Sequence, residues 1–106
     1  MTNETHEIRV ADNPDAHRFE IYLGEQLAGF TAYDLAPGRI VFTHTEVDPS
    51  FEGKGLGSRL ASKALDEVRE RGLTVVARCP FIAAYLARHP EYADLVHGHG
   101  QGASPR

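Results

Sequence analysis

The spacing of apolar residues changes abruptly after Pro49, and this change constrains the fold more than any other feature of the sequence. Before it, alternating or β-branched and aromatic residues predict strands at residues 8–10, 19–23, 26–35 and 39–47. Short turn sequences separate these segments, so the first half of the chain is predicted to form an antiparallel meander. One side of the third strand is expected to carry Leu27, Thr31, Tyr33 and Leu35.

In the second half of the chain, apolar residues recur at spacings of three and four. This predicts one amphipathic helix over about residues 55–71, ended by Gly72. Residues 73–77 form a short apolar run that is typical of a strand. A second helix is expected over about residues 80–87, with proline as its first residue, and a last helical turn over 89–92. Together these elements predict an α+β fold with a mixed sheet.

The length and composition fit a small globular protein of 106 residues, with one domain predicted over residues 7–97. Residues 1–6 and 98–106 are expected to be flexible tails. No run approaches the roughly 20 apolar residues that span a bilayer, and the polar start lacks the apolar segment of a secretory signal. The single cysteine excludes an intramolecular disulfide and indicates a reducing compartment. Together with the missing signal and membrane span, this predicts a cytoplasmic protein without membrane association. A net charge of −4 argues against nucleic-acid binding.

A glycine-rich turn joins the fourth predicted strand to the long predicted helix. The first turn of a helix has backbone amides without partners and a positive dipole end, which suit a phosphate or pyrophosphate group. The candidate binding residues are Gly53, Lys54, Gly55, Leu56, Gly57 and Ser58. The turn lacks the Gly-Lys-Ser/Thr end of a P-loop and the G-x-G-x-x-G spacing of a dinucleotide site. The alternative is an ordinary glycine turn that binds nothing.

Three further residues are candidates for catalysis. Cys79 precedes the second predicted helix, whose dipole favours a thiolate, and the alternative is a buried cysteine that only packs. His44 and Glu46 lie two residues apart on the fourth strand and share a face with Ile40 and Phe42 unless a bulge intervenes. The pair suits a general base or a substrate-holding site, and the alternative is a partly exposed sheet face. No cluster of Cys and His has the spacing of a metal site, so no metal is predicted.

The order of these elements and the glycine-rich turn resemble the GNAT superfamily of N-acetyltransferases. The loop is similar to the Q/R-x-x-G-x-G/A pattern of that superfamily, with Glu52 at the Q/R position and Gly55 and Gly57 at the small positions. The resemblance is closer still to a group of very small stand-alone members, the YjdJ-type N-acetyltransferase-domain proteins, over roughly residues 7–97. The motifs shared with this group are His44-Thr45-x-Val47, the glycine turn, Cys79-x-Phe81, Tyr85 and His89-Pro90-x-Tyr92.

The resemblance implies that the fourth and fifth strands run parallel and splay apart, with acetyl-CoA as the cosubstrate between them. It also implies that the amides of Gly53 to Ser58 bind the pyrophosphate. The backbone N–H at or near Val47 would hold the acetyl carbonyl and stabilise the oxyanion that develops there. Cys79 stands at the position of a candidate active-site cysteine in the small members.

Two mechanisms are compatible with this resemblance. In one, the amine of a small molecule or of a protein lysine attacks acetyl-CoA directly, and His44 or Glu46 accepts its proton. In the other, Cys79 accepts the acetyl group and passes it on, which predicts ping-pong kinetics. The alternative functions are a module that binds CoA or acyl-CoA without efficient catalysis, and a protein-interaction domain. The oligomeric state is not predicted.

Overall fold

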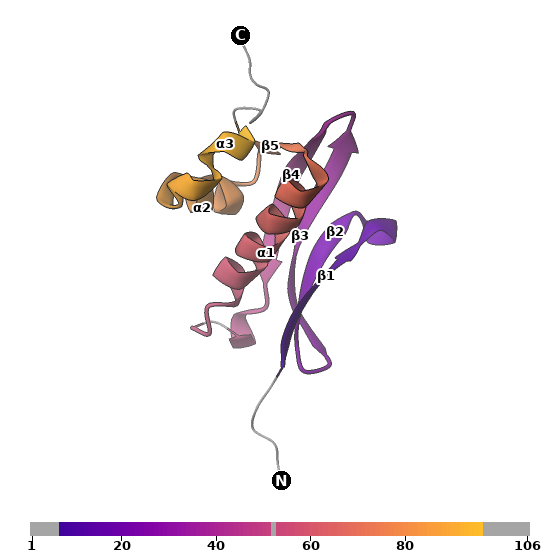
Figure 1. Cartoon of the computed structure of the whole chain (residues 1–106). Helices are drawn as coiled ribbons and strands as arrows, with labels where there is room; N and C mark the ends of the chain where they lie inside the picture. The colour runs from indigo at the N-terminus through magenta and orange to yellow at the C-terminus, as the bar shows by residue number, and fades with distance from the viewer. Residues whose placement is uncertain (1–6, 52, 97–106) are drawn as a thin grey trace.

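The computed structural model describes residues 7–51 and 53–96, so the two predicted tails lie outside the described residues. One sheet has the strand order β1-β2-β3-β4-β5 and is antiparallel except for the pair of β4 and β5 (Figure 1). The strands are β1 (Ile8–Asn13), β2 (Arg18–Leu23), β3 (Gln26–Ala36), β4 (Arg39–Val47) and β5 (Thr74–Ala77). The helices are α1 (Leu56–Arg71), α2 (Pro80–Arg88) and α3 (Ala93–Val96), with 3-10 turns at Pro14–Ala16, Pro49–Phe51 and Pro90–Tyr92. The predicted α+β fold is confirmed.

The three helices pack together against one face of the sheet (Figure 1). α1 forms the crossover from β4 to β5 and buries the apolar stripe that its residue spacing predicts. The buried residues of the stripe are Leu56, Leu60, Ala61, Ala64, Leu65 and Val68. They form one continuous core with strand residues such as Phe19, Ile21 and Phe42. Among the described residues, no helix is long and apolar enough to cross a membrane.

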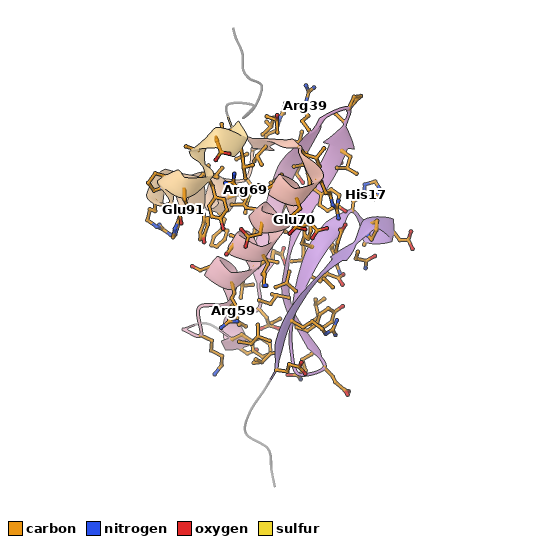
Figure 2. All side chains as sticks on the ribbon, in the orientation of Figure 1. His17, Arg39, Arg59, Arg69, Glu70 and Glu91 are labelled. Carbon is orange, nitrogen blue, oxygen red and sulfur yellow. The ribbon has the colours of Figure 1, made fainter. Side chains whose placement is uncertain are left out.

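The last turn of α1 is tied to the C-terminal elements by hydrogen bonds. Arg69 donates to the Asp94 carboxylate at 2.6 Å and to the Glu91 carbonyl at 2.9 Å, and Figure 2 shows Arg69 and Glu91 at this side of the molecule. The Tyr92 hydroxyl donates to Asp66 of α1 at 2.7 Å. These contacts hold the segment that follows α2 against α1.

A bulge in β3 changes which of its side chains are buried. The pairing with β2 skips Ala28, so the alternation of faces reverses there. Thr31 and Tyr33 are buried, but Leu27 and Leu35 are 40% and 56% exposed. The prediction that these four residues share one side is therefore wrong for Leu27. The bulge turns Leu27 to the other face, and Leu35 lies next to the turn into β4 at the end of the sheet.

A second bulge decides the orientation of two candidate site residues. The pairing of β4 with β3 skips Thr43. Phe42 is fully buried beneath the helices, whereas His44 and Glu46 are exposed. The bulge therefore places His44 and Glu46 on the face opposite to Phe42. The sequence allowed this arrangement only if a bulge intervened. The side chain of Thr45, between His44 and Glu46, points instead to the helix-covered side, where it contacts Cys79.

The helix-free face of the sheet carries a polar network centred on Glu20, which is only 4% exposed. Its carboxylate accepts hydrogen bonds from the Tyr22 hydroxyl at 2.7 Å, from Arg18 Nε at 2.7 Å and from Asn13 Nδ2 at 3.1 Å. Burial opposes ionisation of this carboxyl, but the three hydrogen bonds outweigh burial and hold the pKa of Glu20 below its usual value. The Arg18 guanidinium also lies over the ring of Phe30, 4.5 Å from its centroid.

Glu20→Gln is expected to lower the free energy of unfolding at pH 7 by about 1–3 kcal/mol, because hydrogen bonds to a charged acceptor are lost. The folded pKa lies below the unfolded value of about 4.3. This stability is therefore present above that pH and is lost as the pH falls through the folded pKa. Urea denaturation of both proteins at neutral and acidic pH measures the difference. An equal difference at both pH values would contradict this role for Glu20.

Candidate functional site

The candidate site lies where β4 and β5 separate. Their parallel pairing joins residues 39–42 to β5 and ends there. The Phe42 carbonyl then accepts from the amides of both Arg78 and Cys79, at 2.9 and 3.0 Å, and the chain turns into α2. β4 continues to Val47 without β5 beside it, so the sheet is split at this point. The parallel, splayed arrangement that the resemblance implies is confirmed.

Two backbone amides of β4 point toward this split. The Asp48 amide donates to the Ala28 carbonyl of β3 at 2.8 Å. Along an antiparallel strand, the amides of successive residues point in alternate directions. The amides of Thr45 and Val47 therefore point away from β3, toward the side where β5 has ended. A ligand carbonyl placed in the split can accept a hydrogen bond from either amide.

The first turn of α1 carries no side chain that competes for its backbone amides. Gly55 is the N-cap, with φ of 71°, which is costly for other residues, and it provides no side-chain cap. No acidic residue lies in the first turn. Leu56 is buried in the core and offers only its backbone, whereas Lys54 and Ser58 are exposed. Figure 2 shows Arg59 at the same end of α1, so cations flank the positive end of the helix dipole.

Gly57 joins this helix end to the split in the sheet. A Cβ at Gly57 would lie 2.9 Å from Cζ of Phe81 and 3.7 Å from Cγ2 of Val47. The first turns of α1 and α2 and the end of β4 therefore meet at one point. A side chain at Gly57 would therefore displace the Phe81 ring, whereas Gly53 has φ of 85° and permits the turn itself.

Cys79 lies at the N-cap of α2, as the sequence predicts, but its side chain is enclosed. The residue is 2% exposed, and its Sγ lies 3.0 Å from Oγ1 of Thr45. Thr45 Oγ1 in turn lies 2.8 Å from Oγ1 of the fully buried Thr31. The thiol thus ends a short chain of polar groups on the helix-covered side of β4, in which Thr45 is half-buried.

His44 and Glu46 form a pair on the opposite face of β4. His44 Nε2 lies 2.9 Å from Glu46 Oε2, and the two side chains are 58% and 63% exposed. The His44 ring also lies beside Phe30, with ring centroids 6.0 Å apart. The three candidate catalytic residues therefore do not form one cluster. Cys79 lies on one side of β4, the pair lies on the other, and the Val47 amide lies at the strand edge between them.

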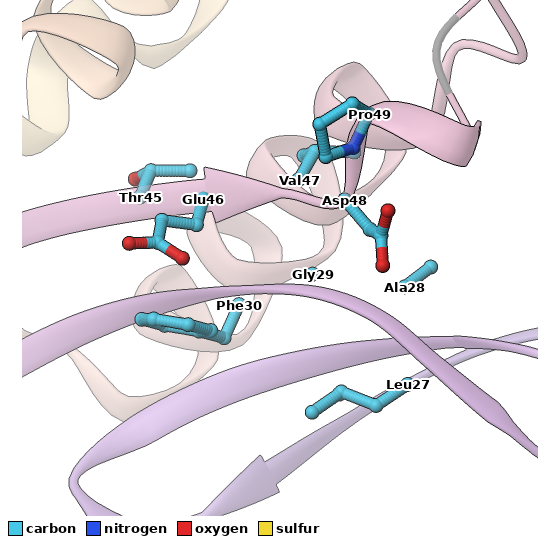
Figure 3. Close-up of a pocket in the computed structure, with 9 residues that line it drawn as sticks. All are labelled: Leu27, Ala28, Gly29, Phe30, Thr45, Glu46, Val47, Asp48 and Pro49. Carbon is cyan, nitrogen blue, oxygen red and sulfur yellow. The ribbon is translucent and has the colours of Figure 1, made fainter.

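A groove of about 650 Å³ lies along the end of β4 on the side of this pair (Figure 3). In Figure 3, Glu46 and Phe30 lie to one side of Gly29 and Asp48 to the other. A Cβ at Gly29 would lie 2.6 Å from the Glu46 carbonyl oxygen, so a glycine is needed for the close approach of β3 to β4. Val47 also lines the groove, which therefore links the helix-free face to the split in the sheet.

Gly29, Phe30 and Asp48 also line the groove, and the sequence did not predict them as site residues. A glycine within a strand pattern often marks a close approach of two backbones, and this signal was available for Gly29. Phe30 has no comparable signal, because its proximity to Glu46 depends on the register between β3 and β4. Asp48 is two residues from Glu46, but only the structure shows that both line one groove.

Two further aspects of the predicted site concern the glycine loop and metals. Glu52, which stands at the Q/R position of the loop pattern, lies outside the described residues. Residues 7–51 and 53–96 contain no group of three or more His, Cys, Asp or Glu that could hold a metal ion.

Comparison with known sequences identifies relatives over most of the chain. Residues 18–95 match the family model of the GCN5-related N-acetyltransferases. Protein NATD1 from Mus musculus is 33% identical over 85 residues, which cover 78% of this chain and 77% of that protein. Protein NATD1 from Gallus gallus is 37% identical over 66 residues, or 61% of this chain and 60% of that protein.

A solved structure shares the fold. It is the ribosomal-protein-S18-alanine N-acetyltransferase from Escherichia coli, with a TM-score of 0.53 and 20% sequence identity. The match covers 70% of this chain but only 42% of that enzyme, so this chain spans less than half of its length. The residues that match the family model include the split between β4 and β5, the glycine turn and α1. The chain therefore belongs to the GCN5-related N-acetyltransferase family.

Proposed function

We propose that the protein transfers an acetyl group from acetyl-CoA to an amine. One observation carries the proposal: the Val47 amide faces the split in the sheet, next to an N-terminus of α1 that has no side-chain cap. The amide can hold a carbonyl oxygen, and the helix end can hold a phosphate. Membership of the family supports acetyl transfer in general, and this geometry supports acetyl-CoA as the donor.

The donor side of the site fits coenzyme A in its chemistry. The amides from Gly53 to Ser58 would hold the pyrophosphate, since the first turn of α1 contains no acid that would repel it. The exposed Lys54 adds a positive charge to the same turn. Phe81, packed against Gly57 and close to Val47, gives an apolar wall between the helix end and the strand edge. A pantetheine arm, which is largely apolar, suits this wall.

On the acceptor side, the residues of β4 can assist direct attack. When bound, acetyl-CoA supplies a thioester carbonyl carbon that the amine attacks, with the coenzyme A thiol as the leaving group. The Val47 N–H donates to the carbonyl oxygen, on which negative charge develops. The Glu46 carboxylate accepts the amine proton, and His44 Nε2, 2.9 Å from Glu46 Oε2, shares it. An alkylamine has a pKa of about 10.4, so it needs such an acceptor near neutral pH.

The burial of Cys79 supports direct transfer over a covalent acetyl-cysteine. Its Sγ is packed within the core and contacts Thr45 Oγ1 at 3.0 Å. Close-packed interiors leave little space for the additional atoms of an acetyl group. We assign Cys79 a positioning role, in which it supports Thr45 and with it the segment of β4 that ends at Val47.

Cys79→Ala is expected to leave kcat within a few-fold of the wild-type value and to lower stability by about 1 kcal/mol, because a small buried side chain is shortened. Initial rates measured with both substrates varied are expected to give intersecting double-reciprocal lines. Parallel lines, or a loss of more than about 100-fold in a folded Cys79→Ala protein, would instead establish Cys79 as the nucleophile.

Isothermal titration with acetyl-CoA and with CoA, followed by a screen of amines for turnover, tests the proposed function. Binding and acetylation are the expected results. Binding of both without acetylation of any amine would favour a CoA-binding module, a function that the high solvent exposure of His44 and Glu46 also favours. Failure of both to bind would show that the glycine turn is only structural.

A further inference from the structure

We propose that the groove in Figure 3 binds an aliphatic diamine, with one ammonium group at Glu46 and the other at Asp48. This inference rests on the proposed function, because the amine at Glu46 is the one that is acetylated. It narrows the acceptor from amines in general to a short carbon chain with a cationic group at each end.

The lining of the groove combines an apolar wall with two carboxylates. Leu27, which is 40% exposed, and Phe30 form the wall. Glu46 and Asp48 lie on either side of Gly29 in Figure 3. A volume of about 650 Å³ is typical of a small-molecule site. A carbon chain against the wall and a cation at each carboxylate would use all of these features.

Each carboxylate has one oxygen held by a neighbouring residue. The Ser50 amide and hydroxyl donate to Asp48 Oδ1 at 2.9 and 2.8 Å, and these bonds lower the pKa of Asp48. His44 Nε2 bonds to Glu46 Oε2. Within the part of the chain that the structure describes, neither Asp48 Oδ2 nor Glu46 Oε1 has a protein hydrogen-bond partner. These two oxygens remain available to a cationic ligand.

The arginine beside the groove does not neutralise these carboxylates. Arg18 lies over the Phe30 ring, with its guanidinium carbon 4.5 Å from the ring centroid. Its Nε is bound to Glu20 at 2.7 Å, so its charge is paired within the network of the helix-free face. A ligand in the groove therefore meets a negative potential from Glu46 and Asp48.

The spacing of the two acids favours a diamine over an amine with a single charge. Asp48 directly follows the end of β4, and its amide still bonds to the Ala28 carbonyl of β3. Residues i and i+2 of an extended chain have Cα atoms about 7 Å apart. Four carbon atoms between two nitrogens span a similar distance, so 1,4-diaminobutane can reach both acids. A lysine side chain carries one ammonium group and would engage Glu46 alone.

The test compares 1,4-diaminobutane with 1-aminobutane, which has the same chain but one charge. NMR titration of each amine into the protein without any CoA measures binding independently of turnover. The diamine is expected to shift the amide signals of Phe30 and Asp48 and to bind more tightly than the monoamine. Asp48→Asn is expected to weaken diamine binding about two- to fivefold, as for loss of one exposed ion pair, and to leave the monoamine unaffected. Asp34→Asn, which removes an exposed carboxylate of β3 outside the groove, is the matched control.

The acetylation assay separates this proposal from the function on which it rests. With acetyl-CoA present, Asp48→Asn is expected to raise KM for the diamine by the same factor and to leave kcat unchanged. If the diamine bound in a way that depends on Asp48 but was not acetylated, the groove would be a diamine site and the proposed acetyl transfer would be wrong. Equal binding of the two amines would overturn the diamine proposal. Displacement of the diamine by a lysine peptide, equally well from the wild type and from Asp48→Asn, would also overturn it.

Discussion

Glu46→Gln is expected to lower kcat for amine acetylation by about 10²–10³-fold, which is typical for loss of a positioned proton acceptor. The Glu46 carboxylate lines the groove on the acceptor side, one residue before the Val47 amide that would hold the carbonyl oxygen. Glutamine keeps the size and the hydrogen bond to His44 but cannot take a proton from the amine. Steady-state kinetics at saturating acetyl-CoA measure the effect.

Two further measurements make this prediction specific. His44→Asn is expected to have a smaller effect, because His44 acts through its 2.9 Å contact with Glu46 Oε2. The affinity for acetyl-CoA is expected to be unchanged in both variants, because the donor side lies at α1 and not on the helix-free face. An unchanged kcat in Glu46→Gln would mean that another group accepts the proton, and the assignment of Glu46 would be wrong.

Ser58→Glu is expected to weaken acetyl-CoA and CoA binding by roughly 10–100-fold, equivalent to about 1.4–2.8 kcal/mol. Ser58 is exposed in the first turn of α1, three residues after the N-cap Gly55. A carboxylate there would compete for the backbone amides and repel a pyrophosphate. The same carboxylate interacts favourably with the helix dipole, so the free energy of unfolding is expected to rise by about 0.3–1 kcal/mol.

The opposite signs of these two effects exclude a trivial explanation by unfolding. Isothermal titration gives the affinities, and thermal denaturation without ligand gives the stability. Ser58→Gln, which has nearly the same shape but no charge, is expected to bind CoA much more tightly than Ser58→Glu. If Ser58→Glu bound CoA as well as the wild type, the N-terminus of α1 would not be the pyrophosphate site.

The secondary structure was largely predictable because its signals are local. The run from Arg39 to Val47 matches β4 residue for residue, and Pro80 begins α2 as its fixed φ angle predicts. α1 ends before Gly72, whose φ of 71° is the left-handed cap expected of glycine. Each of these features depends on residues that are close together in the sequence.

The partition of residues between the two faces of the sheet was less predictable. Alternation alone placed Leu27 on the same side of the strand as Thr31 and Tyr33, but the skipped residue Ala28 turned it to the other face, where it lines the groove. A bulge has no reliable sequence signal at either position, because it arises when the register between two strands is set.

The sequence by itself determined the strands, the helices, the glycine turn and the position of Cys79 before α2, because periodicity, capping and turn preferences act over a few residues. Only the tertiary structure decided that Cys79 is enclosed beside Thr45, while His44 and Glu46 are exposed on the other face and Glu46 lines the groove. The physical reason is the bulge at Thr43, where one additional residue reverses the alternation of β4. The split next to Val47 likewise exists only because β5 ends and turns into α2 while β4 continues.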